Sequence, residues 1–264
     1  MLCLKIQGCV SRGSGDPFLE CSLFMMTPSI VVFVLLHLSV VFASRRILLL
    51  HGSSSSSGVF MARGAANILD AASTAYHDGG PHAWQFVGLD WDLGIDEVTD
   101  YGEWWTSINA ESIRLEKATA GGDKAIAGIE ARLREGDING IVGHGQGAIV
   151  ASVVAARAAL GVEGSYPIQF VVCCGGAFPT PYDELLTRLA ATPPGLRSLE
   201  LPTMHCLSTA DEVFPSAEGE RLAECFGDSE ILWHDGGSAL PPKPECEEVI
   251  AWCDRIVTTG SKYR

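Results

Sequence analysis

Residues 138–148 read Ile-Asn-Gly-Ile-Val-Gly-His-Gly-Gln-Gly-Ala. The stretch opens with apolar residues typical of a buried strand, and residues 147–160, rich in Ala and Val, have the composition of a buried helix. Glycines at 143, 145 and 147 permit a tight turn between the two elements, because glycine reaches backbone conformations that other residues avoid. A strand, a glycine-dense turn and a helix in this order predict an α/β protein with a functional site at the turn.

Two kinds of site use this local shape. In a nucleophile elbow, G-x-S-x-G, a strained turn lifts a catalytic side chain above the sheet. In a dinucleotide-binding turn, G-x-G-x-x-G/A, the backbone holds a pyrophosphate, and Gly143, Gly145 and Ala148 satisfy this pattern formally. That site also needs an acidic residue at the end of the next strand, whereas the predicted strand 168–174 is followed by Gly175 and Gly176. We favour the elbow and keep dinucleotide binding as a second alternative.

Short apolar runs alternate with helical stretches along the rest of the chain, which is typical of a mostly parallel sheet with helices on both faces. The pattern predicts strands over residues 45–50, 84–89, 138–142, 168–174, 204–207 and 231–233. It predicts helices over residues 59–75, 111–134, 147–160, 216–226 and 246–257, and another that begins at Pro181. The sequence shows no internal repeat and no second domain.

Several motifs in the same order resemble the FSH group of small serine hydrolases, over about residues 45–258. The matching residues are Leu50-His51-Gly52, Asp90, Trp104-Trp105, Gly143, Gln146-Gly147-Ala148, Asp211, Pro215, His234 and Gly236-Gly237. The resemblance implies a single-domain α/β-hydrolase fold over residues 44–264. It also implies a Ser-His-Asp triad, whose acid falls on Asp211.

The chain departs from that pattern at two of the three triad positions. The nucleophilic serine of the family falls on Gly145, and the catalytic histidine falls on Ser238. A triad needs an oxygen that attacks the carbonyl and an imidazole that takes its proton, and the acid alone does neither. We therefore expect a serine hydrolase-like protein without catalytic activity. The alternative is an active carboxylesterase or thioesterase with a displaced nucleophile.

The former pocket is then expected to bind a small acyl or ester-like ligand. Backbone amides of Gln146 and of the Ser53 region are candidates for a nest around a carbonyl oxygen. Trp91, Trp104 and Trp105 are candidate ligand contacts, with plain packing as the alternative. We expect no cofactor, and no Cys or His cluster has metal-ligand spacing.

Neither nearby histidine is expected to replace the missing base. His144 adjoins Gly145, but we expect its side chain to point away from the pocket. His234 matches a non-catalytic histidine of the family pattern, so we expect it to hold loop backbone.

Residues 1–43 form an N-terminal extension ahead of the domain. Within it, residues 30–43 are almost wholly apolar and end in Val41-Phe42-Ala43. This length suits a signal peptide better than a membrane span, so we expect no stable span after processing and a protein of the secretory pathway or the extracellular space. The alternative is a cytoplasmic domain behind an over-extended gene start.

The charge of the chain limits the classes of partner that it can bind, and the positions of its cysteines limit which of them can form disulfides. The 18 Lys and Arg against 32 Asp and Glu give a net charge of −14, which repels phosphate backbones and makes nucleic acid an unsuitable partner. Of nine cysteines, Cys173, Cys174 and Cys206 lie in predicted strands as core residues. Cys225, Cys246 and Cys253 are candidates for pairing in an oxidising compartment.

Overall fold

The computed structural model describes residues 45–52, 55–75, 83–89, 104, 122–136 and 138–259. The chain divides into two units, Met1–Val41 and Phe42–Arg264, and every described residue belongs to the second. The predicted N-terminal extension, Ser53, Asp90, Trp91 and Trp105 lie outside the described residues. Over the part of the chain that is described, no helix is long and apolar enough to cross a membrane.

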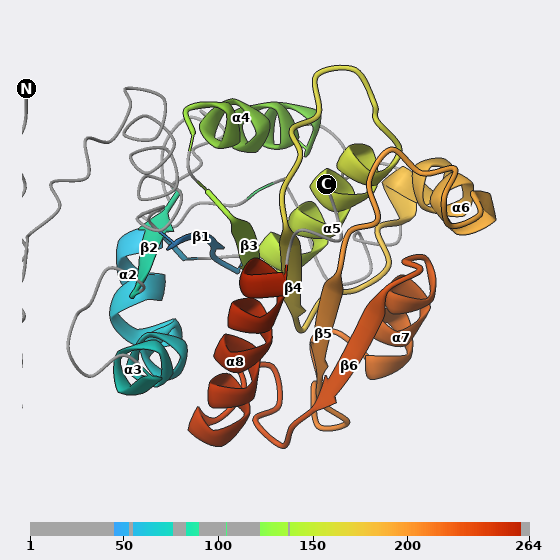
Figure 1. The fold of residues 1–264 in the computed structure, drawn as a ribbon. Helices are drawn as coiled ribbons and strands as arrows, with labels where there is room; N and C mark the ends of the chain where they lie inside the picture. The colour runs from blue at the N-terminus through green and yellow to red at the C-terminus, as the bar shows by residue number, and fades with distance from the viewer. Residues whose placement is uncertain are drawn as a thin grey trace, which may run out of the picture. The chain divides into compact units, whose positions relative to one another are not determined.

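Six parallel strands form one sheet in the order β2-β1-β3-β4-β5-β6 (Figure 1). The strands are β1 Arg45–Leu50, β2 Trp84–Gly88, β3 Gly140–His144, β4 Phe170–Cys174, β5 Thr203–Leu207 and β6 Ser229–Trp233. Every predicted strand is present. The first residue of β3 lies two positions later than predicted. Just before it, Asn139 already bonds to β1: its N–H donates to the Arg46 carbonyl oxygen, and its Oδ1 accepts from the Arg46 N–H, each at 2.8 Å.

Helices cover both faces of the sheet, as expected for strands buried on two sides. They are α2 Ser57–Val59, η1 Phe60–Gly64, α3 Ala66–Ala75, α4 Gly122–Arg134, α5 Gln146–Ala159, η2 Thr180–Tyr182, α6 Asp183–Ala191, α7 Ser216–Glu224 and α8 Lys243–Thr259. One core cluster joins Leu48, Ile141 and Val171 to α4, α5 and α6. The other joins Ile47, Val142 and Val172 to α3 and α8, so alternate strand residues feed opposite faces.

The single helix predicted over residues 59–75 is wrong. A turn of π-helix, η1, separates α2 from α3, and the Ala65 N–H donates to the Phe60 carbonyl oxygen at 2.6 Å. Gly64 explains the interruption, since a Cβ at this position would lie 2.6 Å from Cδ2 of the Phe60 ring. The apolar spacing of the stretch is helical throughout, so periodicity alone could not locate the break.

The strand order reverses between β1 and β3, and this reversal indicates where a ligand site would lie. The chain runs from β1 to the neighbouring β2 and then crosses back to β3 on the other side of β1. In open α/β sheets, ligands bind beyond the carboxyl ends of the strands at such a switch point. Here those ends are Gly52 after β1 and Gly145 after β3.

Two glycines allow the β3–α5 turn to close against β1. A Cβ on Gly143 would lie 2.4 Å from the carbonyl oxygen of Gly147, and a Cβ on Gly147 would lie 2.4 Å from that of Leu50. Neither contact is possible for a residue with a side chain, so α5 reaches the sheet only with glycine at both positions.

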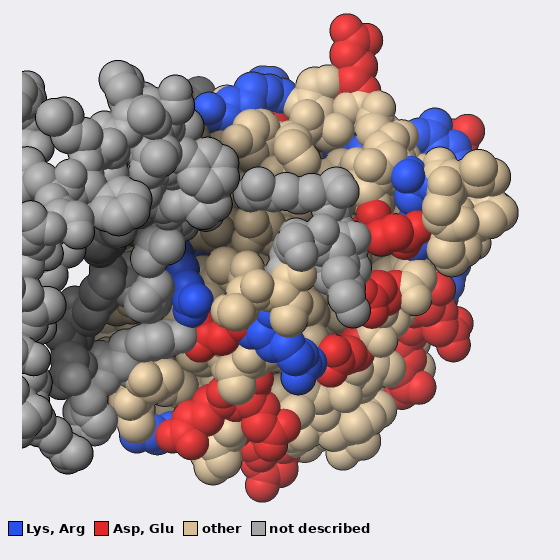
Figure 2. Space-filling view, in the orientation of Figure 1, with Lys and Arg blue, Asp and Glu red and all other residues tan. Residues whose placement is uncertain are grey.

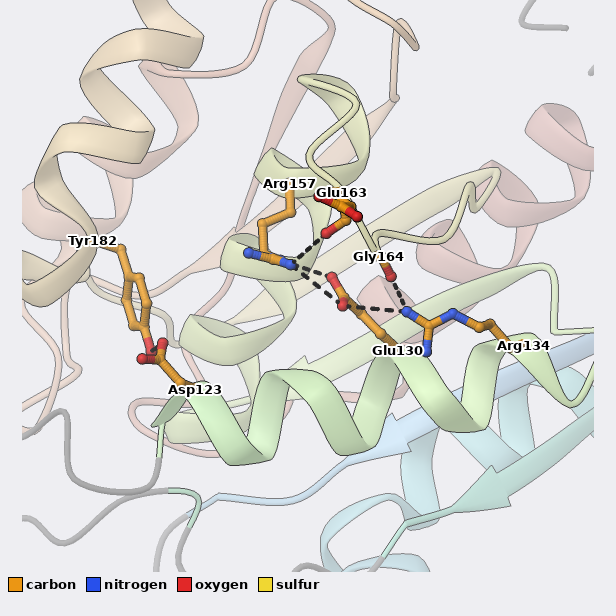
Figure 3. Close-up of polar contacts among 7 residues, drawn as sticks. All are labelled: Asp123, Glu130, Arg134, Arg157, Glu163, Gly164 and Tyr182. Carbon is orange, nitrogen blue, oxygen red and sulfur yellow. Dashed lines mark hydrogen bonds and ion pairs between the residues drawn. The ribbon is translucent and has the colours of Figure 1, made fainter.

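A buried ion pair holds α4 against α5 (Figure 3). The side chain of Glu130 is 4% exposed, and its Oε1 accepts from Nε of Arg157 at 2.7 Å. Arg134 contacts the same carboxylate and also donates to the Gly164 carbonyl oxygen. Because the carboxylate is buried and fully paired, this contact fixes where α4 lies over the sheet.

The three cysteines that the sequence left as candidates for disulfides, Cys225, Cys246 and Cys253, cannot pair with one another. All six cysteines in the described part of the chain are free and buried. Cys225 belongs to the core cluster on one face of the sheet, whereas Cys246 and Cys253 belong to the other. The latter two are seven residues apart on α8, a rise of about 10 Å, which exceeds the roughly 7 Å reach of a disulfide.

Acidic side chains are spread along the lower and right-hand parts of the face seen in Figure 2. This distribution agrees with the net charge of −14 for the chain. Such a surface disfavours polyanions and attracts cations over a range of about a Debye length.

We predict that Gly143→Ala destabilises the fold by about 3 kcal/mol or more, because the new methyl group meets fixed backbone atoms. Gly58→Ala is the matched control, since a Cβ there has nothing within 4 Å, and its effect is expected within about 0.5 kcal/mol. Urea unfolding of the two variants measures the difference. Equal stabilities would show that the turn tolerates a side chain.

We also predict acid sensitivity from His205, which is buried on β5. Its Nε2 lies 3.3 Å from Thr203 Oγ1, its Nδ1 has no hydrogen-bond partner among the described residues, and burial lowers its pKa from 6.5 to about 4. The unfolded chain therefore binds this proton first as the pH falls, so stability is present above pH 6.5 and is lost down to about pH 4. His205→Leu cannot bind this proton, so the variant should avoid up to about 3 kcal/mol of that loss of stability. Denaturant titrations across this pH range measure the difference. An unchanged pH dependence in the variant would contradict the assignment.

Candidate active site

Gly145 has the backbone conformation of a nucleophile elbow. Its φ is 54° and its ψ is −119°, a region that residues with a Cβ adopt only under strain. Its N–H donates to the Cys174 carbonyl oxygen at 2.9 Å, and its own carbonyl accepts from the Ile149 N–H at 3.2 Å. The sharp turn is thus anchored on both sides, and glycine relieves the strain that a serine would carry there.

The space above Gly145 is small and apolar. A Cβ at this position would lie 3.3 Å from Cε2 of Phe214 and 3.6 Å from the Cα of Gly52. Phe214 is not among the site residues that the sequence predicted. Its signal was available in the Asp-x-x-Phe-Pro order of residues 211–215, which places an aromatic ring three residues after the acid.

The carboxylate of Asp211, the predicted triad acid, is held by backbone N–H groups. Its Oδ1 accepts the backbone N–H groups of Val213 at 2.8 Å and Phe214 at 2.9 Å. Its side chain is buried, and its Oδ2 has no hydrogen-bond partner in the described part of the chain. The carboxylate is therefore oriented by backbone, with one oxygen left over for a donor.

Ser238 lies in the loop after β6, next to the Asp211 turn. A Cβ on Gly237 would lie 3.4 Å from the carbonyl oxygen of Ala210, so the two loops are in contact. The Ser238 residue is exposed, and its backbone carbonyl oxygen lies 2.7 Å from Nε2 of His144. A short hydroxyl side chain at this position has no proton acceptor comparable to an imidazole.

His144 does not point away from the site, contrary to the sequence-based expectation. Because a carbonyl oxygen only accepts, Nε2 of His144 carries the proton in its contact with Ser238. The ring stacks on Phe60 with centroids 5.7 Å apart, and its Nδ1 would lie 3.0 Å from a Cβ on Gly52. Burial lowers the pKa of His144, and the Ser238 carbonyl and the charge of Asp211 oppose that shift. The His144 ring thus contacts three other segments of the chain, at Phe60, Gly52 and the Ser238 backbone.

His234 has the structural role that the sequence predicted. Its Nδ1 accepts from the Gly236 N–H at 3.1 Å, which shapes the loop that leads to Ser238. Burial lowers the pKa of His234, whereas Glu245 and Asp211 raise it, so burial dominates.

The first residue of α5 connects the elbow to the core. Oε1 of Gln146 lies 3.3 Å from the Trp104 N–H, and its Nε2 has no partner within the described residues. The indole N–H of Trp104 donates to the His51 carbonyl oxygen at 2.7 Å. Trp104 is wholly buried, so its side chain packs in the core and offers no surface to a ligand, contrary to its candidacy as a ligand contact.

The described residues contain no group of three or more Cys, His, Asp or Glu side chains placed to hold a metal ion. Their arrangement instead consists of an elbow without a side chain, an oriented acid and two histidines bonded to backbone. Of the predicted site residues, Gly145, Gln146, Asp211 and Ser238 are brought to one end of the sheet.

Curated relatives carry esterase names. The chain is 28% identical over 177 residues to esterase C25G4.2 of Caenorhabditis elegans, covering 64% of this chain and 76% of that protein. It is 31% identical over 160 residues to esterase OVCA2 of Bos taurus, covering 58% of this chain and 67% of that protein. It is also 26% identical to rhodanese-like domain-containing protein 6 of Arabidopsis thaliana, covering 80% of this chain and 39% of that longer protein.

Solved structures with the same fold include the Zea mays acyl-protein thioesterase 2, at a TM-score of 0.54 and 19% identity over 80% of this chain and 93% of that one. Esterase PE8 matches at a TM-score of 0.54 and 18% identity, over 81% and 93% of the two chains. At these identities the likeness concerns the fold, which is the α/β-hydrolase fold.

The family match bears on the two interpretations of the glycine turn. The family model described as serine hydrolase (FSH1) matches residues 40–250, which include every strand of the sheet. It favours the elbow over a dinucleotide-binding turn, since the family is one of serine hydrolases. The chain belongs to the FSH1 serine hydrolase family.

Proposed function

We propose that this chain is a serine hydrolase-like protein that has lost ester hydrolysis and binds a small acyl or carbonyl ligand at the former active site. The observation that carries the proposal is the unpaired Oδ2 of Asp211. In a working triad, this carboxylate holds and orients the imidazole. Here the acid keeps its backbone support, but the described residues supply no imidazole to it.

The missing groups are those that perform the chemistry. Gly145 has no atom that could attack a carbonyl carbon, although its backbone conformation is that of the elbow. Ser238 cannot take up the proton that an attacking hydroxyl would release. His144 and His234 each use one ring nitrogen on loop backbone, which supports a structural role for both.

The groups that bind a carbonyl remain. Gln146 begins a 14-residue helix whose first N–H groups have no side-chain cap. Amides at a helix N-terminus favour a partial or full negative charge such as a carbonyl or carboxylate oxygen. The ring of Phe214 beside Gly145 suits a short apolar tail.

The esterase names of the curated relatives favour one rival function. In that rival, the chain is an active carboxylesterase or thioesterase whose nucleophile lies elsewhere. Labelling with a fluorophosphonate separates the two functions, because it requires an activated nucleophile but not a particular position for it.

We predict that the full chain neither reacts with a fluorophosphonate probe nor hydrolyses p-nitrophenyl butyrate above background, and that Gly145→Ser/Ser238→His gains both activities. The double variant restores the attacking oxygen and the base beside an acid that is already oriented. Since φ at position 145 is 54°, the introduced serine should lower stability by about 1–3 kcal/mol. Unfolding curves of the parent and the double variant, measured in parallel, would show how much of the variant is folded under the assay conditions.

Each single variant is the matched control. Gly145→Ser alone lacks the base, and Ser238→His alone lacks the attacking oxygen, so both should remain close to the parent. Adding Asp211→Asn to the double variant should reduce the gain strongly, because the imidazole then loses its orientation. A labelled parent chain would overturn the proposal, and mapping the modified peptide would identify the displaced nucleophile.

A further inference from the structure

We infer that residues 235–240 form a proton-sensitive strap, which the neutral ring of His234 holds closed beside the elbow and which opens when that ring takes up a proton and donates to Glu245. The inference goes beyond the proposed function, because it holds for an active or an inactive site. Its consequence is that acid controls access to the carboxyl end of the sheet near Gly145.

The strap lies between the end of β6 and the start of α8, and it is tied to the elbow in the middle. The Ser238 carbonyl oxygen accepts from Nε2 of His144, the residue before Gly145, at 2.7 Å. Leu240, at the end of the strap, is 4% exposed and belongs to the core. Between these two anchors the backbone bond from the Ala239 N–H to the Gly236 carbonyl oxygen is long, at 3.3 Å. A short exposed segment held by few bonds opens at a low cost in free energy.

His234 closes the strap as a hydrogen-bond acceptor. The Gly236 N–H donates to Nδ1 of His234 at 3.1 Å. Because a backbone N–H can only donate, Nδ1 carries the lone pair and the ring is neutral, with its proton on Nε2. The contact has the form of an Asx turn, in which a side chain accepts from the N–H two residues later. A proton on Nδ1 removes the acceptor and sets two N–H groups against each other, so the charged ring is incompatible with the closed strap.

Glu245 offers the charged ring another partner. This residue lies in the first turn of α8, and its Oε2 is buried without a hydrogen-bond partner among the described residues. Among the charged groups that influence His234, Glu245 has the largest effect on the pKa. A bond from an imidazolium to a carboxylate is stronger than one between neutral groups. The carboxylate without a donor therefore favours the state in which His234 is charged and the strap is open.

The balance of charges around His234 sets the direction of the switch. The groups that act on it are Glu245 from α8, Asp211 after β5, Asp235 in the strap and His144 at the end of β3. The three carboxylates raise the pKa of His234 and His144 lowers it, but burial dominates and holds the pKa below 6.5 in the closed strap. Opening exposes the ring and returns its pKa toward that value. The open form thus binds the proton first, so the closed form is favoured above about pH 6.5 and loses stability as the pH falls below it.

Hydrogen exchange of the full chain, followed by mass spectrometry on peptides that span residues 235–240, tests the strap at about pH 7.5 and about pH 5.5. Each rate is divided by the intrinsic rate of an unstructured chain at the same pH. We expect the corrected rate to rise by about threefold to tenfold at the lower pH, since each pH unit between the two pKa values changes the ratio of open to closed forms by up to about tenfold. Peptides from β4 are the internal reference and should keep their protection.

His234→Asn is the matched variant, because an Asn side-chain oxygen accepts from the N–H two residues later but takes up no proton. Its strap should stay closed, with a change below about twofold between the two pH values. His234→Ala has no acceptor, so its strap should exchange at both pH values as fast as the parent strap does in acid. The other histidines are present in both variants, so their titration is separated from that of His234.

Glu245→Gln tests the second partner, since it removes the negative charge and keeps the volume. It should reduce the acid-induced rise by about half or more. Glu247→Gln, which removes an exposed carboxylate from the same helix, should leave the rise unchanged. A rise that persists in His234→Asn, an unchanged rate in His234→Ala at about pH 7.5, or equal rises in the two glutamate variants would each overturn the inference. These rates do not depend on catalysis, so they are independent of the result of fluorophosphonate labelling.

Discussion

The contact between the first turn of α5 and the carboxyl ends of β1 and β3 is the constraint on which the rest of the structure depends. Cα atoms of Gly143 and Gly147 lie so close to backbone carbonyls that a Cβ at either would fall 2.4 Å from an oxygen. This packing directs the helix N-terminus toward the switch point of the sheet. It therefore sets the position of Gly145, whatever side chain that residue carries.

Around that turn, the sharp strand–helix geometry and the buried carboxylate of Asp211 are both held by backbone hydrogen bonds. The elbow conformation, the oriented acid and the supporting Trp104–His51 contact are all present. Each is maintained by backbone hydrogen bonds or core packing, which serve the fold independently of catalysis. The nucleophile and the base depend on single side chains that the fold does not require, so both can be lost while the architecture remains.

His144 links three segments around Gly145. Its ring joins the strand–helix turn to Phe60 of η1 and to the backbone of the Ser238 loop. Burial keeps this ring neutral, as it does for His205 in the sheet. Among the described residues near Gly145, the histidines are bonded to backbone, whereas Oδ2 of Asp211 has no hydrogen-bond partner.

The sequence by itself determined the strands, their burial on two faces and the sharp turn at Gly145, because apolar periodicity and ordered local motifs are properties of short segments. The role of Asp211 as an acid stays a prediction from the family resemblance. The structure alone decided the π-helical break at Phe60–Gly64, the opposite faces of Cys225 and Cys246, the side to which His144 turns, and the role of Phe214. Each of these depends on contacts between residues far apart in the chain. Ring stacking on Phe60 and a carbonyl 94 positions away orient His144, and neither can be read from the residues beside it.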